Sequence, residues 1–177
     1  MPKRTELTNF IILVLSALLY VRLFYFTQRY QSVELSLLII LLFGAYGLLL
    51  VRYRQLNIKV LLGAALLYRL LPLLALPALS DDFYRFIWDG RLWAAGINPF
   101  AGLPADLVNN PALRAYGITP QLFELLNSPT HYTVYPAIPQ YINWLAAKLF
   151  PHDILHAVLV MRVFIIIAEA GSLWLLV

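Results

Sequence analysis

The sequence predicts an all-α membrane protein, a transmembrane helix bundle of about five spans with one amphipathic helix at the membrane surface. Three observations support this class. Of the 177 residues, 62% are hydrophobic and only 12% are charged, about half the charged share of an average soluble domain. The mean hydropathy is +0.76, and so little charge cannot cover a water-facing surface. The apolar residues also gather in runs of about 20, the length that crosses a bilayer as a helix.

Five apolar runs are candidate spans: Leu7–Phe26, Val33–Val51, Ile58–Leu79, Pro136–Phe150 and Ile154–Val177. The third contains Pro72 and Pro77, which we expect to kink the helix or to mark its exit. The fourth is short, and we expect it to tilt or to begin inside a protein-lined cavity. The fifth reaches Val177 without a polar flank. This predicts that the chain is the N-terminal portion of a longer membrane protein, truncated after its fifth span.

The basic residues predict how the spans are oriented. Lys3 and Arg4 precede the first span; Arg52 and Arg54 lie between the second and the third, and Lys59 is at the start of the third. Because Lys and Arg near spans favour the cytoplasmic side, we expect a cytoplasmic N-terminus and a periplasmic or extracellular loop 80–135. That loop contains three arginines, five acidic residues and no lysine, as expected of an exported segment. The chain thus divides into three spans in 1–79, this loop, and two further spans in 136–177.

Composition also argues against two kinds of function. A net charge of +4 is compatible with nucleic-acid binding, but the Lys and Arg residues lie beside apolar runs, where orientation in the membrane explains them. The absence of cysteine excludes disulfides and thiolate metal sites. No cofactor is predicted. A divalent ion held by Asp81, Asp82 and Asp89 stays open, although carboxylates at this spacing support it only weakly.

The exported loop opens on a segment with the signals of a helix over residues 81–95. Ser80 is a good N-cap, and Asp81 and Asp82 in the first turn complement the helix dipole. Gly96 is a good residue to end the helix. The sequence therefore predicts a helix of about four turns directly after the third span.

This helix is predicted to be amphipathic. Asp81, Arg85 and Asp89 recur every four residues and Asp82 is seven before Asp89, so these polar groups share one face. An apolar side is formed by Phe83, Phe86, Ile87 and Ala94. Such a pattern suits a helix at the membrane surface whose polar face borders an aqueous cavity. The alternative is that the two leading acids only complement the dipole, while Arg85 and Asp89 form a surface ion pair.

Two stretches of the loop resemble a known family. The segment Ser-Asp-Asp-Phe-Tyr-Arg-Phe-Ile-Trp-Asp-Gly-Arg, followed by Gly-Ile-Asn-Pro-Phe at 96–100, resembles the first exported loop of bacterial GT-C superfamily glycosyltransferases, in particular the mannosyltransferase-like branch that uses polyprenyl-phosphate sugars. Residues 132–140 resemble that family's Tyr-Pro-Pro-x-x-Gln signature, with Ala137 where the second proline usually stands. GT-C enzymes have roughly twice as many spans as this chain, and the later ones complete the lipid-binding cavity.

The resemblance implies a glycosyltransferase of a bacterial inner membrane. It would move a hexose such as mannose, with inversion, from a polyprenyl-phosphate donor to the hydroxyl of a glycan or lipid acceptor. The acceptor hydroxyl must lose its proton as it attacks, and a carboxylate within hydrogen-bond reach can take it. One carboxylate acting as base gives inversion without a covalent intermediate. Either Asp82 or Asp81 would be this base, and the sequence does not separate them.

Five further residues are candidates for binding the substrate. Arg85 and Arg91 suit the donor phosphate, because a guanidinium matches phosphate oxygens in a fork; pairing with a neighbouring aspartate is an equally open alternative. Asp89, Asn98 and Tyr135 can bind sugar hydroxyls or simply fix the loop. The competing function is a non-enzymatic membrane protein that binds or transports lipid-linked sugars. A transporter should show broken helices in repeated halves, which this sequence does not.

Overall fold

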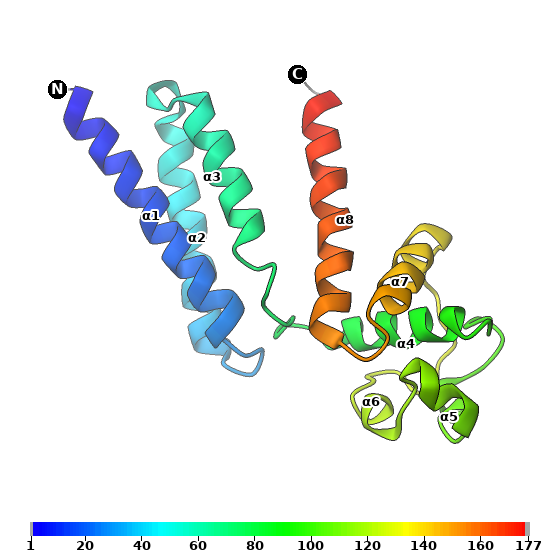
Figure 1. Cartoon of the computed structure of the whole chain (residues 1–177). Helices are drawn as coiled ribbons and strands as arrows, with labels where there is room; N and C mark the ends of the chain where they lie inside the picture. Colours follow the sequence, from blue (N-terminus) through cyan, green and yellow to red (C-terminus); the bar gives the residue numbers. More distant parts are fainter. Residues whose placement is uncertain (1, 176–177) are drawn as a thin grey trace. The chain divides into compact units, whose positions relative to one another are not determined.

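The computed structural model describes residues 2–175, which form helices joined by turns and coil (Figure 1). No β-strand occurs in this range, and the predicted all-α class is confirmed. The predicted truncation after Val177 concerns a part of the chain outside the described residues, as do the side chains of Lys3 and Arg4. The chain forms two compact units, Met1–Leu79 and Ser80–Val177.

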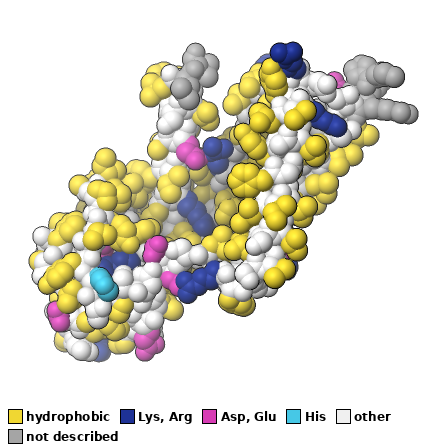
Figure 2. Space-filling view, turned by 180° about the vertical axis from the view of Figure 1, so that it is seen from behind, with side chains coloured by type: hydrophobic (Ala, Val, Ile, Leu, Met, Phe, Trp, Pro, Cys, Tyr) yellow, Lys and Arg dark blue, Asp and Glu magenta, His cyan; other side chains and the backbone are white. Residues whose placement is uncertain are grey.

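Three helices in the described range are long and apolar enough to cross a membrane. They are Thr5–Phe26 within α1 (Pro2–Phe26), α2 (Ser32–Val51) and α8 (Ile154–Leu175). At most 22% of the residues in their apolar windows are buried. Hydrophobic side chains cover much of the visible surface (Figure 2). Apolar surface on this scale requires a lipid environment, and the chain is therefore a membrane protein.

The other two predicted spans are short helices, as expected for Pro136–Phe150 but not for Ile58–Leu79. α3 (Ile58–Leu70) and α7 (Ala137–Leu149) have 13 residues each, so each is about 20 Å long against a hydrocarbon core of about 30 Å. α3 ends before Pro72, because a proline ring clashes with the carbonyl four residues earlier in a helix. Residues 71–75 form turns instead. The described part of the chain thus contains three helices of spanning length where five spans were predicted.

The first unit contains α1, α2, the short 3-10 helix η1 (Tyr53–Gln55) and α3. An ion pair of 2.6 Å between Arg22 Nε and Glu34 Oε1 joins the end of α1 to the start of α2. The hydroxyl of Tyr68 on α3 donates to the carbonyl of Leu13 on α1 at 2.9 Å. These polar contacts hold together helices whose remaining side chains are largely apolar.

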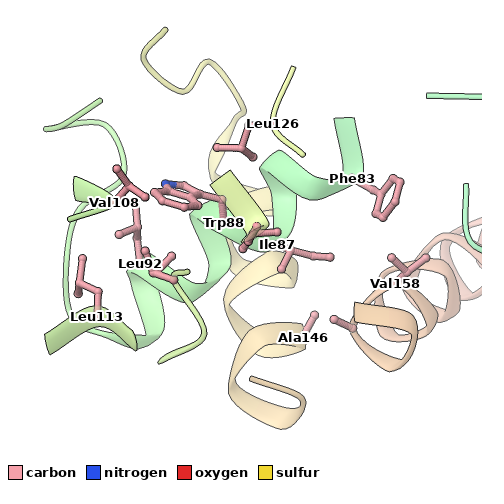
Figure 3. Close-up of a cluster of buried hydrophobic side chains, with 12 residues drawn as sticks. Phe83, Ile87, Trp88, Leu92, Val108, Leu113, Leu126, Ala146 and Val158 are labelled. Atoms are coloured by element: carbon pink, nitrogen blue, oxygen red, sulfur yellow. The ribbon is translucent and has the colours of Figure 1, made fainter. Parts of the chain in front are cut away.

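The second unit is built around α4 (Asp82–Ala94), the helix predicted over 81–95. It packs against α7, α8 and the 3-10 helix η2 (Pro111–Tyr116), while α5 (Pro104–Leu107) and α6 (Pro120–Glu124) complete the loop (Figure 1). Its core contains Phe83, Ile87, Trp88 and Leu92 from α4, with Leu113, Ala146 and Val158 among the residues around them (Figure 3). The predicted exported loop and the last two predicted spans therefore share one core.

The ends of α4 agree only partly with the sequence signals. Gly96 has φ +78° directly after the C-cap Ala95, as predicted for the residue that ends the helix. The predicted N-cap, Ser80, is wrong by one residue, because the N-cap is Asp81. Ser80 instead accepts a hydrogen bond from the backbone N–H of Asp82 at 3.2 Å. It thereby still satisfies one of the free donors at the start of the helix.

Both sides of α4 are covered by protein. Eight of its 13 residues are buried, and Arg85 and Asp89 of the polar face are among them. The polar face was expected to border an aqueous cavity; Arg85 and Asp89 instead meet α7 and the loop before it, whereas Asp82 at the start of the helix is exposed. Gly90 marks the closest approach, since a Cβ at this position would collide with the backbone carbonyl of Asn143 on α7.

Candidate functional site

One side of α4 combines the predicted acid with aromatic and amide groups. Asp82, Phe86, Asp89 and Trp93 are spaced by four, three and four residues, which places them in one row along the helix. The chain from Thr133 into α7 runs beside this row, as the contacts below show. We call this side of the helix the acid face.

At the start of the acid face Asp82 is exposed and held in place by two neighbours. Its Oδ2 accepts from the Ser80 hydroxyl at 2.9 Å, and its Oδ1 accepts from Nδ2 of Asn127 at 2.5 Å. Asp81, half-buried, is the N-cap residue without a capping side-chain hydrogen bond. Burial of the Tyr84 hydroxyl raises the pKa of Tyr84, and the negative charge of Asp81 raises it further. The two candidate bases therefore differ, since Asp82 is the more accessible and is oriented by the loop.

Tyr135 packs against Phe86, which is one turn after Asp82 on α4. Its ring meets the edge of Phe86 with centroids 4.8 Å apart and planes at 86°. Burial first, and then the charges of Asp82 and Asp89, raise the pKa of Tyr135, while Arg85 opposes them. The phenol is therefore neutral at physiological pH and can donate a hydrogen bond. Tyr135 and Asp82, both predicted from the sequence, are thus brought together.

A buried polar network occupies the middle of the acid face. Asp89 is 0% exposed; its Oδ1 accepts from Nε of Arg85 at 2.9 Å. Its Oδ2 accepts from the hydroxyl of Thr133 at 2.5 Å and from Nε2 of Gln140 at 2.9 Å. For Arg85, the open alternative of pairing with a neighbouring aspartate is the arrangement present. Both oxygens of Asp89 are engaged, so this network ties α4 to the loop and to α7.

Arg85 extends the network to the preceding loop. Its Nη1 donates to the carbonyls of Ser128 at 3.0 Å and His131 at 2.9 Å. Arg85 is 2% exposed. A guanidinium presents five N–H donors in a fixed fork, and here the fork orders the residues that lie just before Thr133. Its position is therefore beneath the acid face, inside the protein.

An aromatic cavity lies at the far end of the acid face. It has a volume of about 390 Å³ and is lined by Trp93, Phe100, Ala137, Gln140, Tyr141 and Trp144. Two of these residues carry a buried polar atom without a hydrogen-bond partner, Nε1 of Trp93 and Oε1 of Gln140. Because Nε2 of Gln140 faces a carboxylate, which only accepts, the amide orientation follows and Oε1 points elsewhere. The cavity thus offers ring faces, while these two polar atoms are enclosed by protein.

Sequence reasoning missed several of these groups. Asn127, which orients Asp82, stands 45 positions away from it, and nothing local to either residue signals the contact. Thr133 and Trp144 were likewise not singled out. A signal for Trp144 existed, because Tyr141 and Trp144 are three apart and share a face of α7.

The remaining two predicted site residues lie elsewhere. Asn98 is exposed, and its Oδ1 accepts from the backbone N–H of Phe100 at 3.0 Å, which fixes the turn around Pro99. Arg91 is nine residues after Asp82, about 180° round the helix at 100° per residue. Its Nη1 donates to the carbonyl of Gly117 at 2.7 Å. Arg91 is therefore on the opposite side of α4 from the acid face.

The carboxylates do not assemble into an evident metal centre. Among residues 2–175, no group of three or more His, Asp or Glu side chains could hold a metal ion. Asp89 is enclosed by its three protein donors. The divalent ion left open by the sequence therefore gains no structural support from the described side chains.

These features define a class: an all-helical membrane protein whose second unit carries an acid face and an aromatic cavity. The comparisons with known proteins add no family to it, since no family model, no curated protein and no solved structure matches the chain. The residues of the acid face and the aromatic cavity are therefore the basis for the proposed function.

Proposed function

We propose that this chain is the N-terminal part of a membrane glycosyltransferase of GT-C type, which transfers a sugar from a polyprenyl-phosphate donor to an acceptor hydroxyl with inversion. One observation carries the proposal. An accessible, oriented carboxylate and an aromatic cavity lie on the same side of one helix, α4, in a protein that lies in lipid. The resemblance of residues 80–100 and 132–140 to that superfamily supports the same activity, with mannose as the first sugar to test.

Asp82 is the general base in this proposal. Its carboxylate takes the proton of the acceptor hydroxyl, and the oxygen attacks the anomeric carbon as the bond from that carbon to the phosphate oxygen breaks. The electron pair leaves with the polyprenyl phosphate, which needs no proton to depart. Attack on one face and departure from the other invert the sugar carbon. Asp81 is the alternative base, and Tyr135 donates a hydrogen bond to a sugar hydroxyl.

The aromatic cavity holds a distal part of the acceptor glycan. Trp93 lies 11 residues after Asp82, about 16 Å along the helix, too far to touch the reacting carbon. Aromatic faces suit the apolar faces of a sugar ring. The cavity is lined mainly by aromatic rings, so stacking on these rings would be the contact that holds the sugar.

The proposal also needs a placement in the membrane. We propose five membrane-embedded segments, with α3 extended by residues 71–79 and α7 as the two short ones. The N-terminus is then cytoplasmic, the loop 80–135 is exported from a bacterial inner membrane, and α4 lies at the outer surface. Further spans beyond this chain would complete the cavity for the lipid chain of the donor.

A second candidate function has one observation in its favour. Each oxygen of Asp82 already accepts a hydrogen bond from the protein, which leaves fewer lone pairs to take the proton of a substrate hydroxyl. This favours a protein that binds or transports a lipid-linked sugar without transforming it. Sugar binding without transfer by the full-length wild-type protein would select this alternative.

Matched variants of the acids test the transferase. Asp82→Asn keeps the shape of the side chain and its contact with Asn127 but removes the base. We expect transfer from a panel of polyprenyl-phosphate sugars to fall about 10²- to 10⁴-fold, with donor binding and melting temperature unchanged. Asp81→Asn is tested beside it, and Asp106→Asn, an exposed acid of α5, is the control. Full activity in both Asp82→Asn and Asp81→Asn would remove the general-base assignment.

A further inference from the structure

Arg91 is a buried cation without a buried anion to balance it. It is 4% exposed, its Nε has no hydrogen-bond partner, and its one hydrogen bond goes to the neutral carbonyl of Gly117. No carboxylate among the described residues forms an ion pair with it. Arg85 on the same helix has a carboxylate and two carbonyls as partners. Of the two buried arginines of α4, Arg85 therefore has a balanced charge and Arg91 does not.

Such a charge is costly unless something balances it. Burial lowers the pKa of Arg91 to about 10, so the guanidinium is still charged at physiological pH. Buried charged groups in folded proteins are normally paired or hydrogen-bonded. No anion of the described residues fills this role, so an anion from solution or from a lipid is a candidate partner.

A cavity beside Arg91 has room for this partner. Its volume is about 200 Å³, and its lining includes Arg91, Gly117, Thr119, His152 and Ile154. The Thr119 hydroxyl accepts from the backbone N–H of Leu122, which leaves its own proton to donate. His152, on the surface, adds a second group that can donate. The polar side chains around the cavity thus present donors toward a common space.

Gly117 packs directly against the guanidinium of Arg91. It has φ +81°, and a Cβ there would come within 2.8 Å of Cζ of Arg91. It would also collide with the carbonyl of Pro151. Only glycine therefore fits between the arginine and the connection from α7 to α8.

The position of the cavity indicates where its ligand comes from. Ile154, part of its lining, is the first residue of α8, a helix of spanning length. With α8 placed across a bilayer, as its length and composition allow, the cavity at its first residue would lie near the lipid headgroups.

We propose that the Arg91 cavity binds a phosphate group, either that of an anionic phospholipid headgroup or a free phosphate ion. A guanidinium with unfilled donors binds phosphate oxygens in a fork, and Thr119 and His152 complete the contacts. The site is on the opposite side of α4 from the acid face. It therefore does not depend on the proposed sugar transfer.

The test uses the full chain, purified in uncharged detergent and stripped of lipid. Melting temperature is measured with inorganic phosphate, and separately with short-chain phosphatidylglycerol, each against chloride at equal ionic strength. We expect a rise of about 5 °C at saturation with at least one probe. A rise with phosphate alone identifies a free-ion site, and a rise with the lipid identifies a headgroup site. No rise with either probe overturns the proposal.

Variants assign the rise to this cavity. Arg91→Gln should abolish it, and Thr119→Val and His152→Gln should each reduce it. The control is Arg114→Gln, because Arg114 is exposed on η2 and is not part of the cavity lining. If Arg91→Gln does not fold, the other two variants decide. A rise that is equal in wild type, Thr119→Val and His152→Gln contradicts the assignment, whatever the result for sugar transfer.

Discussion

A single carboxylate, that of Asp89, joins three segments of the second unit. It pairs with Arg85 on its own helix, with Thr133 in the loop and with Gln140 on α7. Asp89→Asn would leave the buried charge of Arg85 without its counter-charge and place an amide among donors. We expect a loss of about 3–5 kcal/mol in the free energy of unfolding, measured by thermal or denaturant unfolding in detergent.

The control for Asp89 is another aspartate without these partners. Asp106→Asn changes an exposed acid of α5 and should change stability by no more than about 0.5 kcal/mol. The sequence left open that Asp89 binds a sugar hydroxyl. Wild-type stability of Asp89→Asn together with lost sugar binding would support that role and contradict the structural one.

At the scale of elements, α4 and α7 cross so closely that one position admits only glycine. A Cβ at Gly90 would collide with the backbone carbonyl of Asn143, and backbone cannot move aside as a flexible side chain can. We expect Gly90→Ala to lower the melting temperature and to cost about 1–3 kcal/mol through overpacking, although alanine is the better helix former.

Gly171→Ala is the matched control for this crossing. Gly171 is also a helical glycine of the second unit, in α8, but nothing lies within 4 Å of a Cβ built there. Alanine should leave stability unchanged or raise it slightly. Equal stabilisation by both substitutions would show that the helices can separate at Gly90 without loss.

The helices themselves were partly predictable from local signals. α4 was expected over 81–95 from its polar spacing and from Gly96, and it is observed over Asp82–Ala94. The short length of α3 was not expected. The apolar residues continue beyond Pro72, but proline has no N–H to donate and clashes with the preceding turn, so the helix ends before it. Burial of the polar face of α4 was missed as well, since spacing shows which residues share a face but not what covers it.

At the scale of the whole molecule, the predicted orientation assigns each loop to one side of the membrane. The chain has no cysteine, so single cysteines can be introduced into an unreactive background. We expect Tyr30→Cys and Asn109→Cys, both at exposed positions, to react with a membrane-impermeant thiol reagent on intact cells. Gln55→Cys should react only after permeabilisation, because basic residues around it favour the cytoplasm.

The unmodified chain is the blank for this experiment, and labelling after lysis shows that each cysteine is reactive. Protection of Asn109→Cys on intact cells, with labelling of Gln55→Cys, would reverse the predicted orientation. The loop 80–135 would then face the cytoplasm, and a transferase that acts on exported lipid-linked sugars would be ruled out.

The sequence by itself determined that this protein is helical and lives in lipid, because composition, apolar runs and helix-ending residues act locally along the chain. It also placed Asp82 and Tyr135 among the candidates. The tertiary structure decided their surroundings: Asn127 on Asp82, Gln140 on Asp89 from 51 positions away, and Arg91 in a cavity of its own. Contacts of this kind depend on which distant segments pack together in the core, and the local spacing of residues does not predict that packing.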